Sequence, residues 1–312
     1  MGERPDITVV GAGIIGCAVA YELGRRGADV RVIDRRNVGC GATQASAGVL
    51  APFIEADHPG PLRALGVRSL ELYDEFVADV VADSGDDVPY ERSGTLEVAT
   101  DETALSRLER ARQGLVSAGV DCRLLGRAEA REAEPHLGAA AWGALLVPSQ
   151  GFVGAVALTA ALCRAGVRHG VTFLTSRTAR RVSVGDGGIE IETTRGPVTS
   201  DAVVLAAGSW AGRVVVDGEA PLPIRPVRGQ LLRLMWPGAP LARVIWSPRC
   251  YAVPWRDGSV LVGATVEEVG FDERATVSGV TMLLDAVRDL LPATKHAGFD
   301  EVRVGLRPGT PD

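Results

Sequence analysis

The chain has 312 residues, of which 46% are hydrophobic and 23% are charged. Both values are close to those of globular proteins, which excludes a disordered or fibrous chain and allows a sizeable core. At about 100–200 residues per domain, the length exceeds one minimal domain. The formal net charge of −6 argues against nucleic acid or an anionic membrane surface as the main partner.

The cysteines and histidines give no sign of a disulfide framework or a bound metal. The five cysteines form no C-x-x-C pair, and the four histidines show no metal-ligand spacing. Residues 137–163 contain no charged side chain, but glycines and Pro148 interrupt them. This favours a buried strand, a turn and a helix start over a membrane span. The sequence thus predicts a cytoplasmic protein without a membrane partner.

The first 34 residues predict one βαβ unit. Residues 7–10 are a short β-branched run typical of a buried strand, and a glycine-rich turn follows at once. The apolar spacing of residues 14–23 favours a helix that ends near Gly24. Residues 30–33 favour a second strand, which Asp34 closes. This order is typical of a right-handed dinucleotide-binding unit.

Single residues of this stretch fit the physical roles that such a unit requires. Gly11 permits the tight turn, Gly13 lets the backbone approach a pyrophosphate, and Gly16 lets the helix pack against the sheet. The helix N-terminus supplies N–H donors to the phosphates. Asp34 would accept hydrogen bonds from an adenosine ribose and repel a 2′-phosphate, which disfavours NADP. The unit alone leaves NAD and FAD open.

After residue 34, α/β stretches typical of the first unit alternate with stretches rich in strands. Residues 35–60 predict a long loop, and helices are expected over 61–83, 102–118, 156–168 and 276–291. Strands are expected over 94–99, 171–174, 181–184, 189–193, 202–208, 229–235, 251–254 and 260–264. We therefore predict an α/β fold with a discontinuous Rossmann-like domain and an inserted mixed β-sheet substrate domain. The expected boundaries are 1–85, 150–217 and 300–312 for the first, and 86–149 and 218–299 for the second.

Several further motifs resemble the FAD-dependent glycine/D-amino acid oxidase family. Residues 41–52 (GATQASAGVLAP), soon followed by Glu55, resemble its flavin-contacting loop. The other matching motifs are Arg228-Gly229-Gln230, residues 250–254 (CYAVP), residues 262–267 (VGATVE) and residues 305–312 (GLRPGTPD). The match runs from residue 5 to the last residue and is most like the glycine oxidase branch connected with thiamine biosynthesis. The family pattern continues past Asp312, so the sequence predicts a fragment or a truncated protein.

The resemblance implies a non-covalently bound FAD and the residues around it. Backbone near the helix start would face the pyrophosphate, the residues that end the second strand would lie at the adenosine, and the loop backbone would run along the isoalloxazine ring. The implied residues are Gly11, Gly13, Ile14, Ile15, Gly16, Asp34, Arg35, Ala42, Thr43, Ala47, Gly48, Val49, Ala179 and Gly208.

The resemblance also implies that Tyr251 and Arg307 hold the carboxylate of the substrate. A guanidinium offers a planar fork that grips a carboxylate with two parallel hydrogen bonds, which a lysine cannot do. Arg249 is a second candidate for this clamp. It stands two residues before Tyr251, and alternate residues of a strand share a face.

The implied activity is the oxidation of glycine or a small D-amino acid to an oxo acid, ammonia and hydrogen peroxide. The implied partners are therefore a small amino acid or amine and O2, with a homo-oligomer as a further expectation. Alternatives left open are a secondary-amine (N-methyl amino acid) oxidase or dehydrogenase, an NAD-dependent dehydrogenase, and a binding or scaffold protein without turnover. Because a flavin would carry the chemistry, no His–Asp dyad or activated cysteine is needed.

Overall fold

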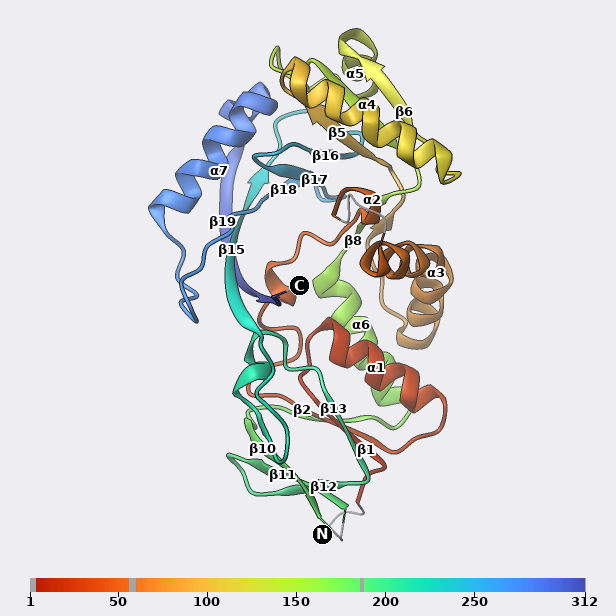
Figure 1. The fold of residues 1–312 in the computed structure, drawn as a ribbon, viewed down its shortest axis with the longest axis vertical. Helices are drawn as coiled ribbons and strands as arrows, with labels where there is room; N and C mark the ends of the chain where they lie inside the picture. The colour runs from red at the N-terminus through yellow and green to blue at the C-terminus, as the bar shows by residue number, and fades with distance from the viewer. Residues whose placement is uncertain (1–3, 56–59, 186–187, 312) are drawn as a thin grey trace.

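A parallel sheet of four short strands lies toward one end of the molecule in the computed structural model, which describes residues 4–55, 60–185 and 188–311 (Figure 1). In spatial order its strands are β13 (Ala202–Leu205), β1 (Ile7–Val10), β2 (Val30–Ile33) and β9 (Thr172–Leu174). The helices that pack on it are α1 (Ile14–Arg25), α3 (Pro61–Ser84) and α6 (Ala155–Arg168). The strand–turn–helix–strand unit at the start of the chain is therefore present as predicted.

The two faces of this sheet are covered by different layers, because successive side chains of a strand point to opposite faces. Val9 and Val32 belong to the hydrophobic cluster with the helices. Val10 and Ile33 pack instead against a second, antiparallel sheet. The strands of that sheet are, in order, β12 (Val198–Ser200), β11 (Gly188–Thr193), β10 (Ala179–Gly185) and β14 (Val215–Val216). This end of the molecule thus has three layers.

Strand β13 is shorter and less buried than its apolar sequence predicts. The strand expected over 202–208 ends at Leu205, and a 3-10 turn, η2 (Gly208–Arg213), follows. It lies at the edge of the parallel sheet, paired only with β1, so one side remains partly accessible. Its side chains nevertheless meet a layer on each face, as its continuous apolar run predicts: Val204 packs with the helices, and Val203 and Leu205 pack with the second sheet.

An eight-stranded mixed sheet forms the other end of the molecule (Figure 1). Its order is β19 (Gly298–Gly309), β15 (Arg225–Met235), β18 (Ser259–Gly263), β17 (Tyr251–Pro254), β16 (Val244–Trp246), β5 (Thr95–Ala99), β7 (Gly143–Val147) and β6 (Arg123–Gly126). All neighbours are antiparallel except β16 and β5. The long pair β15–β19 reaches from this sheet toward η2, where the Ser209 hydroxyl donates to the Leu306 carbonyl (2.8 Å).

Each face of the large sheet packs against different elements. On one face, α7 (Val277–Leu290) and α5 (Arg127–Ala133) complete the largest hydrophobic cluster. On the other, α4 (Glu102–Ser117) covers one edge. The middle of that second face, with Leu231 and Val253, packs against Ala45 and Ala47 of the loop after β2. This loop therefore lies between the two ends of the molecule.

Short elements shape that loop. It contains η1 (Thr43–Ala45), β3 (Val49–Leu50) and α2 (Pro52–Glu55), and β3 joins β8 (Gly151–Val153) and β4 (Tyr90–Glu91) in a three-stranded sheet. A further 3-10 turn, η3 (Pro292–His296), follows α7. Within the described residues, no helix is long and apolar enough to cross a membrane. Residues 137–163 fold as β7, β8 and most of α6, as the strand, turn and helix prediction required.

Candidate functional site

A first cavity of about 420 Å³ opens where β1 and β2 end and α1 begins. The carboxyl ends of parallel strands are the usual binding edge of such a sheet. Ten of the residues expected at FAD line it: Gly11, Gly13, Ile14, Ile15, Asp34, Arg35, Ala42, Thr43, Ala179 and Gly208. Ile15 is 67% exposed, although it is a large apolar side chain at a cavity wall.

The glycine turn is built for close backbone approach. Gly11 has a φ of +115°, and a Cβ there would overlap the carbonyl of Ala206 on the neighbouring strand end. A Cβ on Gly16 would overlap the carbonyl of Gly11. Gly16 therefore serves packing and does not line the cavity. The Ile14 amide at the start of α1 donates to the Thr43 hydroxyl (3.1 Å), which ties the loop to this helix end.

Asp34 is tied to the glycine turn. One carboxylate oxygen accepts a hydrogen bond from the Ala12 amide (2.7 Å), and the other accepts one from the Arg36 amide (2.6 Å). A carboxylate has about four acceptor sites, so these two bonds fix its direction and leave acceptor capacity toward the cavity. The acid at the end of the second strand is thus held rigidly beside the expected pyrophosphate position.

A second cavity of about 330 Å³ continues from the first and shares the walls Ile14, Ala42 and Thr43 with it. Its further walls are Ala45, Ser46, Ala47, Gly48, Val49, Glu55, Gly229, Leu231, Trp246, Tyr251, Gly305 and Arg307. The remaining loop residues expected at the flavin and both residues expected at the substrate therefore meet in one cavity. The two cavities together form a long site that runs from Asp34 to the large sheet.

Arg307 and Tyr251 reach the second cavity from separate strands of the large sheet. Arg307 lies on β19, and its Nη1 donates to the Thr265 carbonyl (3.0 Å). Tyr251 begins β17, and its hydroxyl lies near enough to the Arg307 guanidinium for that cation to lower the pKa of the hydroxyl. A tyrosine hydroxyl can accept a hydrogen bond from a guanidinium and still donate its own hydrogen to another acceptor.

Glycines on the sheet make room for these two side chains. A Cβ on Gly229 would overlap the Arg307 guanidinium, and a Cβ on Gly263 would overlap the Tyr251 phenol. Gly305 pairs with Gly229 across β15 and β19, and a Cβ there would crowd the backbone of Ala42. The sheet therefore carries glycines, which have no side chain, at the positions that Arg307, Tyr251 and the loop after β2 approach.

The electrostatics of the second cavity are set by three ionisable groups. Burial raises the pKa of Tyr251 to about 12, Arg307 lowers it and Glu55 adds to the rise. Loss of hydration at the cavity wall raises the pKa of Glu55, and the charge of Arg307 partly offsets this. Arg307 makes no ion pair with any described carboxylate. A cation and a carboxylate therefore line one cavity without neutralising each other in a direct pair.

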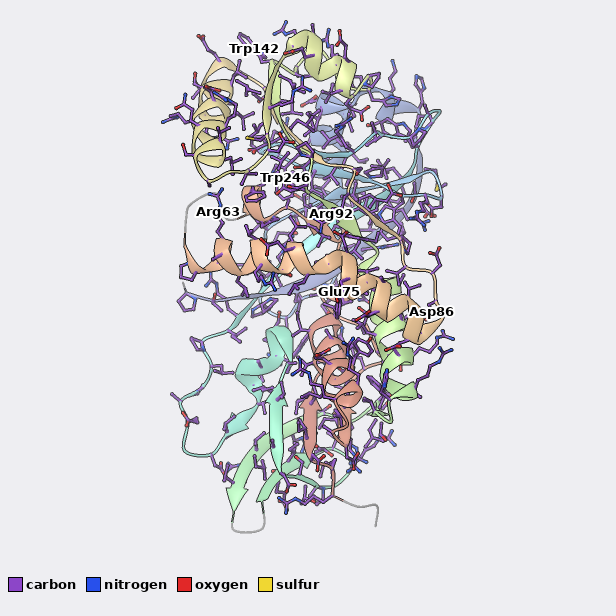
Figure 2. The ribbon with its side chains drawn as sticks, turned by 90° about the vertical axis from the view of Figure 1, so that its right-hand side faces the viewer. Arg63, Glu75, Asp86, Arg92, Trp142 and Trp246 are labelled. Atoms are coloured by element: carbon purple, nitrogen blue, oxygen red, sulfur yellow. The ribbon has the colours of Figure 1, made fainter. Side chains whose placement is uncertain are left out.

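Trp246 was not predicted at the site. It ends β16, and its ring stacks on Tyr251 with centroids 5.0 Å apart. Figure 2 shows Trp246 above the start of α3, where Arg63 also lies. Trp246 and Glu55 also line a third cavity of about 550 Å³ that includes Arg63. No motif marked Trp246; only the register of β16 with β17, which sequence does not give, brings it to Tyr251.

The structure rules out Arg249 as the clamp. Arg249 lies before the first residue of β17 and forms a surface ion pair with Asp289 (2.7 Å), with both side chains more than half exposed. It lines none of the three cavities described above. The expectation that it shares a face with Tyr251 was wrong, because the strand begins only at Tyr251 and the alternation does not extend to residue 249.

The long site fits FAD by its own geometry. The glycine turn admits a pyrophosphate, Asp34 offers acceptors at one end, and the loop backbone of Ala47 and Gly48 borders the other end. None of the residues that the structure describes forms a group of three or more His, Cys, Asp or Glu side chains placed to hold a metal ion. Among the described cysteines, Cys250 is buried and lines neither cavity.

This fold and this site are those of a flavin-dependent oxidoreductase. Residues 6–312 match the DAO family, described as FAD dependent oxidoreductase, and the chain belongs to this family. It is an FAD-dependent amino acid oxidoreductase of mixed α/β fold. The glycine oxidase of Geobacillus kaustophilus is 31% identical over 314 residues, which cover 100% of this chain and 83% of that protein.

Three further comparisons extend this result. The bifunctional protein ThiO/ThiG of Nostoc sp. is 33% identical over 312 residues, which cover 98% of this chain and 46% of that protein. The crystal structure of the Geobacillus kaustophilus glycine oxidase matches with a TM-score of 0.95 at 30% identity, covering 100% of this chain and 84% of that chain. The crystal structure of iminodiacetate oxidase from Chelativorans sp. BNC1 matches with a TM-score of 0.84 at 29% identity, covering 98% and 84%.

Proposed function

We propose that this protein oxidises glycine or a small D-amino acid to the oxo acid, ammonia and hydrogen peroxide. The observation that carries the proposal is the meeting of Arg307 and Tyr251 with loop residues 45–49 in one cavity. A bound FAD would supply the redox chemistry, as acceptor of a hydride from the α-carbon and donor of the electrons to O2. Water then converts the imine to the oxo acid and ammonia, so that amino acid, O2 and water balance the three products.

The cavity walls support a zwitterionic substrate. The carboxylate would take parallel hydrogen bonds from Arg307 and one from the Tyr251 hydroxyl. Glu55, on the same cavity, would accept a hydrogen bond from the substrate amine. With both ends of the amino acid held, the α-hydrogen has a fixed direction, and such positioning is a large part of catalysis.

The size of the cavity supports a small side chain. Ligand cavities usually measure about 300–1,000 Å³, and this one lies near the lower limit at about 330 Å³. It must also accommodate the ring of the cofactor, since loop residues 45–49 belong to its wall. The stacked rings of Trp246 and Tyr251 form a further part of the wall. Little space is left beyond the α-carbon of a bound amino acid.

We further propose that FAD is bound non-covalently by the residues of the first cavity. All its wall residues lie within 1–85, 150–217 and 300–312, which supports the predicted extent of the cofactor domain. The second cavity adds Gly229, Leu231, Trp246 and Tyr251 from the predicted substrate domain, so it lies between the two. The thiamine-connected branch that the sequence resembles is the proposed metabolic context, with O2 as the proposed electron acceptor.

A secondary-amine oxidase is the second candidate, because the matched iminodiacetate oxidase is named for a secondary amine. The third cavity supports it: it shares Glu55 and Trp246 with the second, so an N-substituent could extend there. The two proposals differ in the substrate only. Both use the same clamp for the carboxylate.

Peroxide formation with a matched substrate set tests the proposal. The purified, FAD-loaded protein is assayed with glycine, D-alanine, sarcosine and iminodiacetate, and ammonia is measured alongside peroxide. We expect the highest kcat/KM with glycine or D-alanine and equal amounts of ammonia and peroxide. Higher kcat/KM with the secondary amines, and methylamine or glycine as the product in place of ammonia, would favour the second candidate. No turnover with any of the four would contradict both.

A further inference from the structure

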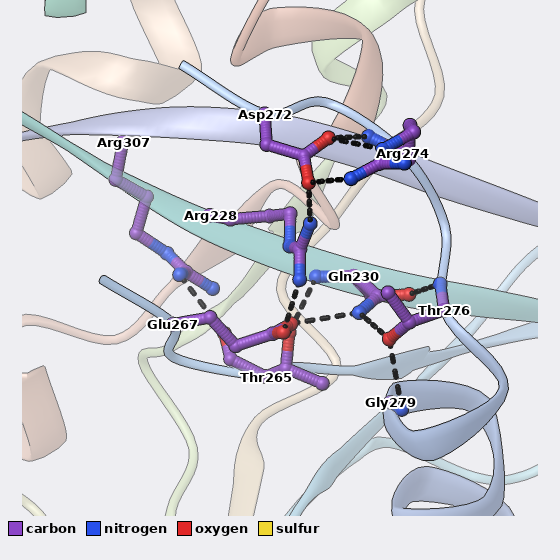
Figure 3. Close-up of polar contacts among 9 residues, drawn as sticks. All are labelled: Arg228, Gln230, Thr265, Glu267, Asp272, Arg274, Thr276, Gly279 and Arg307. Atoms are coloured by element: carbon purple, nitrogen blue, oxygen red, sulfur yellow. Dashed lines mark hydrogen bonds and ion pairs between the residues drawn. The ribbon is translucent and has the colours of Figure 1, made fainter. Parts of the chain in front are cut away.

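A buried polar network stands directly behind Arg307 (Figure 3). It joins β15 to residues 264–276, the segment that connects β18 to α7, which we call the connecting segment. Arg228 and Gln230 extend from β15 into this network and are 4% and 0% exposed. A charge buried in this way is costly unless it is paired and hydrogen-bonded. Arg228 and Gln230 line neither the first nor the second cavity, so the function proposed above gives their side chains no role.

Glu267 is the centre of the network. Its Oε2 pairs with Nη2 of Arg228 (2.6 Å), while its Oε1 accepts from the Gln230 side-chain amide (2.7 Å) and from the Thr265 hydroxyl (2.6 Å). Asp272 pairs with the other terminal nitrogen of Arg228 (3.1 Å). Three different partners thus fix the orientation of the Glu267 carboxylate.

Thr265 connects this centre to the clamp. Its hydroxyl accepts from the Gln230 backbone amide (2.9 Å), and its own amide donates to the Gln230 carbonyl (3.2 Å). Its side chain and its backbone are therefore fixed at the same time. The carbonyl of this residue is the acceptor for Nη1 of Arg307 (3.0 Å). No described carboxylate is paired with Arg307, so this carbonyl is the hydrogen-bond acceptor that orients it.

We propose that Glu267, acting through Thr265, is a positioning residue for the carboxylate clamp. Glu267 fixes the position of the Thr265 carbonyl, and this oxygen accepts a hydrogen bond from one terminal nitrogen of Arg307. The rest of the guanidinium edge then faces the cavity. The inference rests on the proposed function in one respect, namely that Arg307 binds the substrate carboxylate. Glu267 itself touches neither cavity and is not a catalytic residue.

The test uses Glu267→Gln and Thr265→Val in the FAD-loaded protein. Glu267→Gln keeps the shape but loses the charge opposite Arg228, and Thr265→Val removes only the hydroxyl. We expect each variant to raise KM for glycine and the Kd of acetate by about tenfold. This is the change in affinity that the loss of roughly one hydrogen bond to the carboxylate would cause. Acetate is a carboxylate without an amine, and its binding is read from the visible spectrum of the bound flavin. The kcat should change less than about threefold.

Matched variants separate positioning from general stability. Thr265→Ser restores the hydroxyl and should return KM and the acetate Kd to within about twofold of the parent protein. Glu268→Gln removes the neighbouring exposed ion pair with Arg225 and should leave both unchanged. A lowered melting temperature in Glu267→Gln and Thr265→Val with an unchanged acetate Kd would overturn the inference, because the network would then only stabilise the fold.

Arg307→Ala distinguishes this inference from the proposed function. If Arg307→Ala leaves the acetate Kd unchanged, Arg307 is not the carboxylate ligand and the proposed clamp fails. If Arg307→Ala weakens acetate binding but Glu267→Gln and Thr265→Val do not, only the positioning role of Glu267 is overturned. Weaker binding in all three, with rescue in Thr265→Ser, is the expected result.

Discussion

Arg307 has no described carboxylate partner, in contrast to many arginines of the chain. Arginines such as Arg249 and Arg256 form exposed ion pairs with carboxylates, which contribute little to stability. Arg307 instead donates to a backbone carbonyl and lies beside the Tyr251 hydroxyl at a cavity wall. Neither partner neutralises its charge, so an anion is the missing counterpart.

Arg307→Lys tests whether the Arg307 side chain binds the substrate carboxylate. A lysine keeps the charge but loses the fork, so carboxylate binding should weaken by about 1.5–3 kcal/mol, which raises KM for glycine at least about tenfold. Steady-state kinetics measures this, and the spectrum of the bound flavin should stay intact. A variant with the KM of the parent protein would show that the carboxylate is held elsewhere.

The two pKa shifts in the cavity predict a pH dependence. Glu55 must be ionised to accept from a substrate ammonium, so activity should fall as pH falls through its raised pKa. Tyr251, with its pKa raised to about 12, keeps its hydrogen and its donor role at all lower pH values. In kcat/KM profiles, Glu55→Gln should therefore remove the acid limb, and Tyr251→Phe should raise KM without moving either limb below about pH 11. An acid limb that persists in Glu55→Gln would exclude Glu55 as the titrating group.

At the scale of single elements, the first strand–turn–helix unit and the glycines of the large sheet were predicted with different success. Gly11, Gly13 and Asp34 could be assigned from spacing, because their contacts are local to one βαβ unit. The role of Gly229 depends on Arg307, which stands on the neighbouring strand 78 positions later in the sequence. Register between distant strands is not a local property of the sequence.

Asp34→Ala tests the role of the first strand–turn–helix unit. The variant removes the acceptor for the ribose and also frees the amides of Ala12 and Arg36, so FAD binding should weaken by about 1–3 kcal/mol. The Kd follows from flavin fluorescence during titration of the apoprotein. Asp217→Ala, which removes an exposed ion pair with Arg181, is the control and should keep the parent Kd. Equal Kd values for the two variants would remove Asp34 from the FAD site.

Gly229→Ala tests the role of the glycines in the large sheet. The new methyl group would displace the Arg307 guanidinium, so KM for glycine should rise about tenfold or more while FAD affinity is unchanged. Gly114→Ala, at an exposed helix position with open space around it, is the matched control and should leave KM unchanged. An unchanged KM in Gly229→Ala would mean that the clamp does not depend on the flat sheet surface.

At the scale of the whole molecule, most helices and strands could be predicted because their periodicity is local. The helix expected over 276–291 is α7 within one residue, with the Thr276 side chain as its N-cap. What could not be predicted is which strands meet. Trp246 reaches the site, and Arg249 does not, because of strand pairing and the point at which β17 begins. The long site arises only where the loop after β2 packs on the large sheet.

If the proposed function is correct, glycine or a small D-amino acid held by Arg307 delivers its electrons to a flavin in this long site. The most direct measurement is the visible flavin spectrum of the FAD-loaded protein mixed with glycine, and separately with D-alanine, in the absence of oxygen. The account predicts rapid loss of the flavin absorption with at least one of them, its return when O2 is admitted, and a much higher half-saturating concentration in Arg307→Lys. A flavin that binds but stays oxidised with both amino acids would contradict the account.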